Sequence, residues 1–268
     1  RLSAGRGHDA FGDVDWELEG GVVDPGDRRF VLPDSEPLAR SAWYQGLPPE
    51  EQARVGLVRL ASCLATAWQF ENLLQQGLLH RALYLADGPD AATEFRYVHH
   101  EVIEESQHTL MFHEFVARSG IAVRGMPKGL QRFVEFLAPR VSLHDAAFFF
   151  FMVLGGEDPL DDLQRDRLAR GDAHPVLEQI MRIHVAEEAR HISYARSSLR
   201  KHVANVGRAH RFSLSLFVPL TVGIMVNLMM RPTHDLVGAG VPREVVDEAY
   251  GTPFGRAHLA AGAARPRH

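Results

Sequence analysis

The chain has 268 residues, of which 46% are hydrophobic, and a formal net charge of -5 from 29 basic and 34 acidic residues. This length allows a sizeable buried core. Because no long block of one charge sign occurs, the composition excludes the electrostatic footprint of a nucleic-acid-binding or anionic-membrane-binding protein. The single cysteine, Cys63, excludes an internal disulfide and a cysteine-based metal site. Together with the absence of a secretory signal pattern, it predicts a cytoplasmic protein.

The first 47 residues are rich in glycine, proline and aspartate and show no sustained hydrophobic period. They are expected to form an irregular arm over the domain surface. Pro48 and Pro49, followed by two glutamates, are typical of a helix start and predict a helix from residue 48 to about residue 86. A second helix is predicted from about residue 89 to residue 119, directly before Gly120.

Helical patterns continue through the second half of the chain. A strongly apolar third helix is predicted over residues 141–157, after a short helical pattern at 133–137. Pro159 lacks the amide that a continuing helix needs, so we expect a kink there or a restart with Asp158 as the cap. A fourth helix is predicted over about 174–205, a fifth from about 208, and a short one over 242–250.

Residues 212–230 contain no charged side chain and approach the length of a membrane span. Serine, proline, threonine and asparagine also occur there, so a buried core helix or a subunit-interface helix is favoured over a membrane element. With no alternating strand pattern of useful length, the chain is predicted to be an all-α helical bundle. The expected divisions are an arm at 1–47, a helical domain at 48–235 and a C-terminal extension at 236–268.

Two predicted helices carry the same motif, Glu-Glu-x-x-His. The second helix has it at Glu104, Glu105 and His108, and the fourth helix has it at Glu187, Glu188 and His191. A carboxylate and an imidazole three residues apart project from one helix face, so each pair can bind one metal ion. Two copies of Glu-Glu-x-x-His on separate helices are far less likely to arise by chance than a single Glu-x-x-His.

A two-metal centre in a ferritin-like four-helix bundle also needs one carboxylate from each of the other two core helices. Glu71 is the only acidic residue between Glu51 and Asp87, and Glu157 ends the apolar third helix. Either residue could instead be a solvated surface position, but an isolated glutamate in an apolar run is costly to bury without a cation. His184 lies on the same stripe of the fourth helix as Glu188, so it is a further candidate ligand.

The charges of such a centre balance, since four carboxylates neutralise two divalent cations while three histidines stay neutral. Oxygen and imidazole ligands without thiolate favour iron, with manganese possible. Glu105 and Glu188 are the expected bridging carboxylates. Glu104 and Glu187 are either hydrogen-bond acceptors that fix the tautomers of the metal-bound imidazoles or solvent-facing helix charges.

The sequence around these residues resembles the p-aminobenzoate N-oxygenase family of ferritin-like di-iron oxygenases. The similarity is carried by HVAEEARHISYAR at residues 184–196, with an extra histidine before the Glu-x-x-His pair, and by GGEDPLD at 155–161. It covers about residues 45–230 and implies a homodimer in which each chain binds two iron ions. The ligands that it implies are Glu71, Glu105, His108, Glu157, His184, Glu188 and His191.

The resemblance also implies an activity. A small-molecule substrate, O2 and an external electron donor would meet at the iron pair, and the nitrogen of an amine would be oxidised to a hydroxylamine, nitroso or nitro group. Apolar residues near the third helix, Phe148 to Phe151 with Leu74 and Met152, are expected to exclude water from the pocket.

The sequence around Glu71 lacks the cationic residue that a p-aminobenzoate site is expected to have. The substrate carboxylate would need a cation, yet no lysine or arginine occurs between Arg59 and Arg81 around Glu71. A carrier-bound amine, a neutral amine, and a C-H substrate for a hydroxylase or desaturase therefore stay open. An iron-storage or iron-binding ferritin relative is a further alternative, although it needs neither the third histidine nor the long arm.

Overall fold

The computed structural model describes residues 7–85 and 91–264, and these ranges contain helices but no strand. The all-α prediction is confirmed. The 3-10 helices are η1 Leu18–Gly21, η2 Arg28–Phe30 and η3 Pro37–Arg40. The α-helices are α1 Ala42–Gln45, α2 Pro49–Ala82, α3 Ala91–Ser119, α4 Lys128–His144, α5 Ala146–Arg170, α6 Pro175–Val203, α7 Arg208–Met230, α8 Thr233–Gly238, α9 Arg243–Gly251 and α10 Pro253–Ala264.

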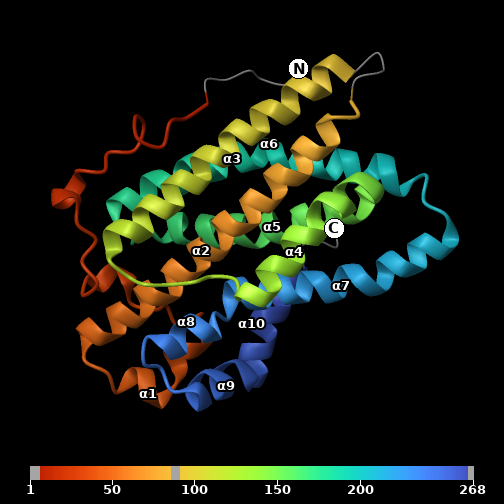
Figure 1. Ribbon diagram of the computed structural model, residues 1–268. Helices are drawn as coiled ribbons and strands as arrows, with labels where there is room; N and C mark the ends of the chain where they lie inside the picture. The colour runs from red at the N-terminus through yellow and green to blue at the C-terminus, as the bar shows by residue number, and fades with distance from the viewer. Residues whose placement is uncertain (1–6, 86–90, 265–268) are drawn as a thin grey trace.

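Four long helices, α2, α3, α5 and α6, form the ferritin-like bundle. Helix α2 packs beside α3, and α5 packs beside α6, while α3 also contacts α6 (Figure 1). Their facing surfaces share a core that includes Phe112 and Phe115 of α3 and Ile180 of α6, all fully buried. The bundle therefore brings one face of each of the four helices toward a common interior.

Helix α2 begins as predicted, with Pro49 in its first turn and Glu50 and Glu51 at the positive end of its dipole. It ends at Ala82, earlier than predicted, and a turn follows at Leu83. The predicted end at residue 86 lies outside the described residues, as does the predicted start of the second helix at residue 89.

The third core helix differs from its prediction at both ends. It starts at Ala146 rather than at 141, because the side chain of Asp145 caps it by accepting a hydrogen bond from the backbone amide of Phe148 at 3.0 Å. It then continues through Pro159 to Arg170, so the expected restart with Asp158 as the cap is wrong, while the expected kink stays a prediction. Residues 153–161 of this helix are all buried, and packing on every side outweighs the loss of one helical hydrogen bond.

The arm and the C-terminal helices are joined to α2 by a buried polar cluster. The guanidinium of Arg59 on α2 lies 3.0 Å from Oε2 of Glu36, and the hydroxyl of Tyr250 on α9 donates to the same carboxylate. The arm also passes very close to α2 at Gly56, where a Cβ atom would lie 1.8 Å from the carbonyl oxygen of Phe30. These contacts hold the arm against the bundle.

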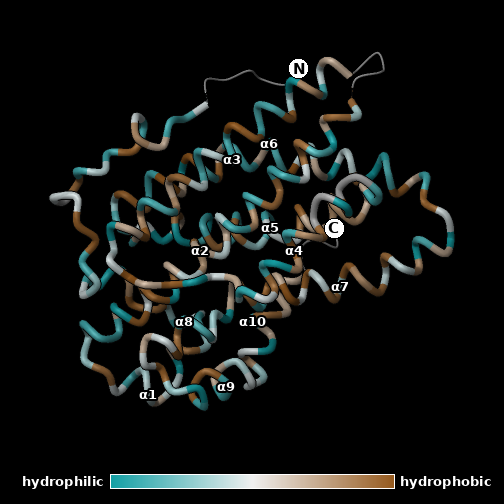
Figure 2. The backbone as a smooth tube through the Cα atoms, in the orientation of Figure 1, coloured by the Kyte–Doolittle hydropathy of each residue, from teal (hydrophilic) through white to brown (hydrophobic). Residues whose placement is uncertain are grey.

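Helix α7 lies along the outer edge of the bundle, and hydrophobic residues recur along it (Figure 2). One face packs on α5 and α10, but Phe212, Leu216 and Leu220 are between 55% and 67% exposed. The stretch Arg208–Gly238 is long and apolar enough to cross a membrane, and only 28% of its most apolar part is buried. The core-helix prediction is therefore wrong, because hydrophobicity alone does not specify what covers a helix; the subunit-interface alternative stays a prediction.

Candidate metal centre

The seven predicted ligand residues come together in the interior of the bundle. Helix α2 contributes Glu71, α5 contributes Glu157, and the other five come from the matching faces of α3 and α6. All are buried, with relative exposures of 1% for Glu71, 4% for Glu157 and 0% for the others. The surface alternatives for Glu71 and Glu157 are therefore wrong.

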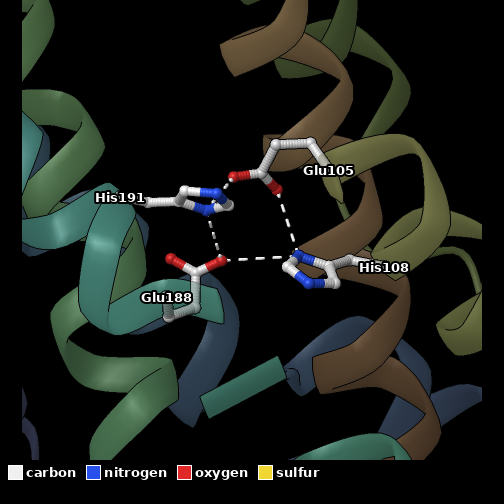
Figure 3. A group of neighbouring side chains, drawn as sticks. All are labelled: Glu105, His108, Glu188 and His191. Carbon is white, nitrogen blue, oxygen red and sulfur yellow. Dashed lines mark hydrogen bonds and ion pairs between the residues drawn. The ribbon is translucent and has the colours of Figure 1, made fainter. Parts of the chain in front are cut away.

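The two Glu-x-x-His pairs face each other across α3 and α6 (Figure 3). Nδ1 of His191 lies 2.9 Å from Oε1 of Glu105 and 3.1 Å from Oε1 of Glu188. Nδ1 of His108 lies 3.4 Å from Oε2 of Glu105 and 3.4 Å from Oε1 of Glu188. Each of the two carboxylates thus faces both imidazoles, which is the placement that the bridging assignment requires.

The other three residues extend this group on one side. Nε2 of His184 lies 3.4 Å from Oε1 of Glu71 and 3.8 Å from Oε1 of Glu188. Among the described residues, three overlapping sets have potential ligand atoms that all lie within 4.8 Å of one another. They are Glu105, His108, Glu188 and His191; Glu71, His108 and His184; and Glu157, His184 and Glu188.

The donor atoms of this centre fit a pair of metal ions. Many are buried without a hydrogen bond: both oxygens of Glu105, both ring nitrogens of His184, Nδ1 of His108, Oε1 of Glu71, and Oε2 of Glu157 and Glu188. Each unsatisfied buried polar atom costs about 1–3 kcal/mol. Divalent cations would satisfy them and offset the four carboxylates, and mixed oxygen and imidazole donors without thiolate fit iron or manganese.

The remaining glutamate of each motif reaches across to the opposite helix. Oε2 of Glu104 on α3 lies 2.9 Å from Nε2 of His191, and Oε2 of Glu187 on α6 lies 2.8 Å from Nε2 of His108. Both glutamates are buried, so the solvent-facing alternative is wrong. An Nε2 proton donated to each carboxylate leaves Nδ1 of each ring free to bind metal.

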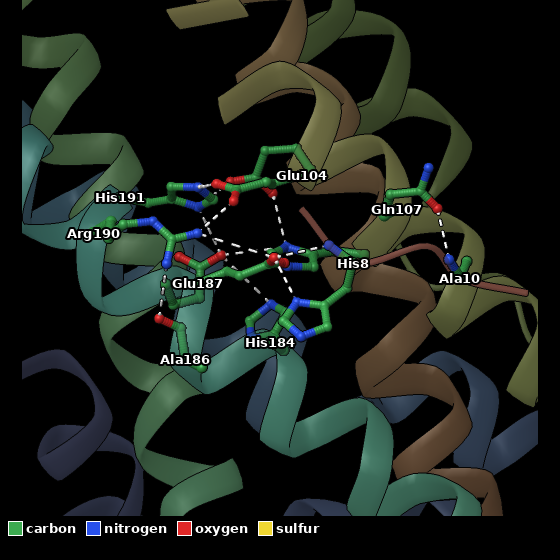
Figure 4. Close-up of polar contacts among 12 residues, drawn as sticks. His8, Ala10, Glu104, Gln107, His184, Ala186, Glu187, Arg190 and His191 are labelled. Atoms are coloured by element: carbon green, nitrogen blue, oxygen red, sulfur yellow. Dashed lines mark hydrogen bonds and ion pairs between the residues drawn. The ribbon is translucent and has the colours of Figure 1, made fainter. Parts of the chain in front are cut away.

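The irregular arm covers this side of the centre (Figure 4). Nδ1 of His8 lies 2.8 Å from Oε1 of Glu187, and the amide of Ala10 donates to Oε1 of Gln107 at 2.7 Å. On the α6 side, Arg190 donates to Glu104. Although burial opposes ionisation, hydrogen bonds from His108 and His8 lower the pKa of Glu187 to about 2. Glu187 is therefore a carboxylate at neutral pH.

The electrostatics of the metal-free centre show strong competition among its carboxylates. Burial raises the pKa of Glu157 well above its usual range, and the charges of Glu188, Glu105 and Glu71 raise it further. Burial also opposes ionisation of Glu188, but its pKa is held well below the usual value by the neighbouring imidazoles, His191 foremost. Without cations the four carboxylates cannot all be ionised together, so metal binding and proton release are linked.

Two residues near the centre, Glu101 and His8, were not predicted from the sequence. Glu101 lies one turn before Glu105 on α3 and is 1% exposed, and burial raises its pKa to about 8. The spacing of four residues from Glu105 is the signal that could have found it. His8 lies in the aperiodic arm, 179 residues before Glu187, and no local pattern indicates its contact.

A large cavity adjoins the centre at Glu157. It has a volume of about 550 Å³ and is bounded by α2, α4, α5 and α7. Leu74, Phe148, Phe149 and Met152 line it, as expected for a water-excluding wall. Phe150 and Phe151, by contrast, are not among the described residues that line it. Phe150 packs edge-on against Tyr194 with ring centroids 5.7 Å apart, on the α6 side of the helix.

Comparison with known proteins agrees with this geometry. The model of the family described as P-aminobenzoate N-oxygenase AurF matches residues 1–267. Two uncharacterized proteins, one from Mycobacterium bovis and one from Mycobacterium tuberculosis strain H37Rv, are each 39% identical over 260 residues, which cover 96% of this chain and 75% of the relative. No solved structure gives a significant match. The chain therefore belongs to the p-aminobenzoate N-oxygenase AurF family of di-iron oxygenases.

Proposed function

We propose that this protein is a non-haem di-iron oxygenase that oxidises a small organic substrate with O2, with N-oxygenation of an amine as its reaction. The observation that supports the proposal most directly is the convergence of four carboxylates and three imidazoles from four helices. Their donor atoms are buried and largely lack other partners. Family membership supports the same chemistry.

The seven residues would hold two iron ions, and Glu105 and Glu188, which each face the imidazoles of both His108 and His191, are the carboxylates placed to serve both ions. When bound, the iron pair supplies the electrons and the coordination sites that O2 activation needs. An external donor would return the electrons. Manganese could occupy the same ligands, because affinity for oxygen and imidazole donors does not by itself select iron.

The remaining residues act by positioning and by exclusion of water. Glu104 and Glu187 hold the Nε2 protons of His191 and His108, and so keep both Nδ1 atoms directed at the centre. The arm covers Glu187 through His8, while apolar side chains of α4, α5 and α7 enclose the substrate side. These features keep the centre dry, which strengthens every electrostatic interaction inside it.

Anaerobic loading with ferrous iron tests the proposal. We expect about two irons per chain. Addition of O2 should change the absorption spectrum, and this change should disappear faster when an amine is bound. His191→Ala should lower the iron content well below two per chain, whereas His113→Ala, at an exposed position of the same α3 helix that carries His108, should not. Unchanged stoichiometry in His191→Ala would contradict the ligand assignment, and tens of irons per chain would indicate storage.

A further inference from the structure

The cavity beside Glu157 has the size and position of a substrate pocket. Its volume of about 550 Å³ falls within the range of about 300–1,000 Å³ that is usual for small-molecule sites. Glu157 and Gly156 of α5 lie in its wall, so the cavity reaches the metal centre. Its opposite walls are α4 and α7, which belong to neither pair of the four-helix bundle (Figure 1).

Few polar side chains line this cavity. Among the described residues that line it, none is a lysine, arginine or histidine, and the polar side chains are those of Asp145, Glu157, Ser213 and Thr221. The carboxylate of Asp145 is already engaged by His210 at 2.7 Å and by the α5 amide cap. The hydroxyl of Thr221 donates to the carbonyl of Phe217 at 2.8 Å.

This lining disfavours an anionic ligand. A carboxylate moved into an apolar cavity without a cationic partner loses its hydration and gains no charge-assisted hydrogen bond. The two carboxyl groups in the wall, those of Asp145 and Glu157, offer no positive charge to such a ligand. Hydrocarbon surface, by contrast, gains about 0.8 kcal/mol for each methylene that leaves water, or about a fourfold gain in affinity.

We propose that this cavity binds a neutral, mainly hydrocarbon substrate that carries no carboxylate. The reactive end of the substrate lies at Glu157, and its apolar part lies between α4 and α7. The exposed side chains of Phe133, Phe217 and Leu220, which are 55% to 60% exposed and also line the cavity, form an apolar rim through which such a molecule enters. The assignment of a substrate to this cavity rests on the proposed oxygenase function.

Two arylamines that differ only at the para position test the substrate class. 4-Butylaniline and p-aminobenzoate both carry a neutral amine at pH 7, but only the second is an anion. Isothermal titration of the metal-free and the anaerobic iron-loaded protein should show at least tenfold tighter binding of 4-butylaniline. Affinity should rise by up to about fourfold per methylene from 4-ethylaniline to 4-butylaniline. Equal or tighter binding of p-aminobenzoate would overturn the proposal.

A lysine introduced into the wall should reverse the preference. Thr221→Lys should lower the affinity for 4-butylaniline and raise the affinity for p-aminobenzoate, each by at least tenfold. The ammonium group makes the wall less apolar and supplies a counter-charge for the carboxylate. Ser215→Lys is the matched control, since Ser215 is an exposed α7 residue whose hydroxyl also bonds its own helix. Leu220→Lys, at the 60% exposed rim, should shift the preference in the same direction and is compatible with folding. If the preference between the two arylamines is unchanged in both Thr221→Lys and Leu220→Lys, the assignment is contradicted.

Failure of this inference can be told apart from failure of the proposed function. If 4-butylaniline binds and responds to Thr221→Lys but the protein holds no iron, the cavity assignment stands and the oxygenase proposal falls. If iron binds and reacts with O2 but 4-butylaniline does not bind, the cavity assignment falls and the oxygenase proposal stands.

Discussion

Oε2 of Glu187 on α6 lies 2.8 Å from Nε2 of His108 on α3. The converse contact, from Glu104 on α3 to His191 on α6, has nearly the same length, 2.9 Å. The doubled glutamate of each motif therefore has two separate uses. The second glutamate faces its own histidine and the metal centre, while the first orients the histidine of the other helix.

The first prediction concerns these two crossed contacts. Glu187→Gln and Glu104→Gln should each lower the iron affinity by about 10–100-fold, because the amide is a weaker acceptor for the imidazole N-H. Competition with a chelator measures the affinity. Glu178→Gln on α6, where the carboxylate pairs with Arg182 near the surface, serves as the control. Wild-type affinity in both variants would show that the contacts do not support the ligands.

The second prediction concerns the conflict between stability and metal binding at Glu71. Burial raises the pKa of this carboxyl group, so its ionised form destabilises the metal-free fold at neutral pH. Glu71→Gln should therefore raise the melting temperature of the metal-free protein by a few degrees, and it should reduce the additional stabilisation that iron provides. Thermal unfolding with and without iron measures both changes. A lower melting temperature of the metal-free variant would contradict this account.

Much of the centre could be predicted because helical spacing fixes which side chains share a face. Glu105 with His108 and Glu188 with His191 follow from one turn of helix, and Glu71 follows from its isolation in an apolar run. His8 could not be predicted, since a contact across 179 residues from an aperiodic arm leaves no local signal. The continuation of α5 through Pro159 depends on tertiary packing, which outweighs local helix preference.

The cavity could be predicted only in part. Leu74, Phe148 and Met152 lie on helix faces that the sequence places near Glu71 and Glu157, and they line the cavity as expected. The opposite wall depends on where α4 and α7 dock, and hydrophobic periodicity carries no information on that. The same reason accounts for α7, whose apolar composition predicts burial but whose outer face is exposed.

The third prediction is a pH dependence that arises from Glu101. Its carboxyl group keeps a proton up to about pH 8 in the folded protein, whereas the unfolded chain releases it near pH 4.5. The folded state thus binds more protons between these values, so its stability falls as pH rises through this window. Glu101→Gln removes the effect. The stability advantage of this variant over the metal-free wild type should grow from pH 5 to pH 8, by up to about 3–5 kcal/mol.

Denaturant unfolding at a series of pH values measures that difference. Glu114→Gln provides the control on the same helix, because its carboxylate pairs with Arg118 near the surface. We expect the stability of the control to differ from that of the wild type by nearly the same amount at every pH. Parallel profiles for Glu101→Gln and the wild type would mean that Glu101 is ionised in the folded protein at neutral pH.

The fourth prediction concerns the close approach of the arm to α2. A Cβ atom at position 56 would lie 1.8 Å from the carbonyl oxygen of Phe30, and a backbone atom cannot move away as a side chain can. Gly56→Ala should therefore destabilise the protein by about 3 kcal/mol and lower its melting temperature by about 6–12 °C. It should also expose the arm to limited proteolysis. Gly129→Ala, where the added Cβ meets no atom within 4 Å, should leave both measurements nearly unchanged. If Gly56→Ala behaves like Gly129→Ala, the arm does not rest on α2 at this point in solution.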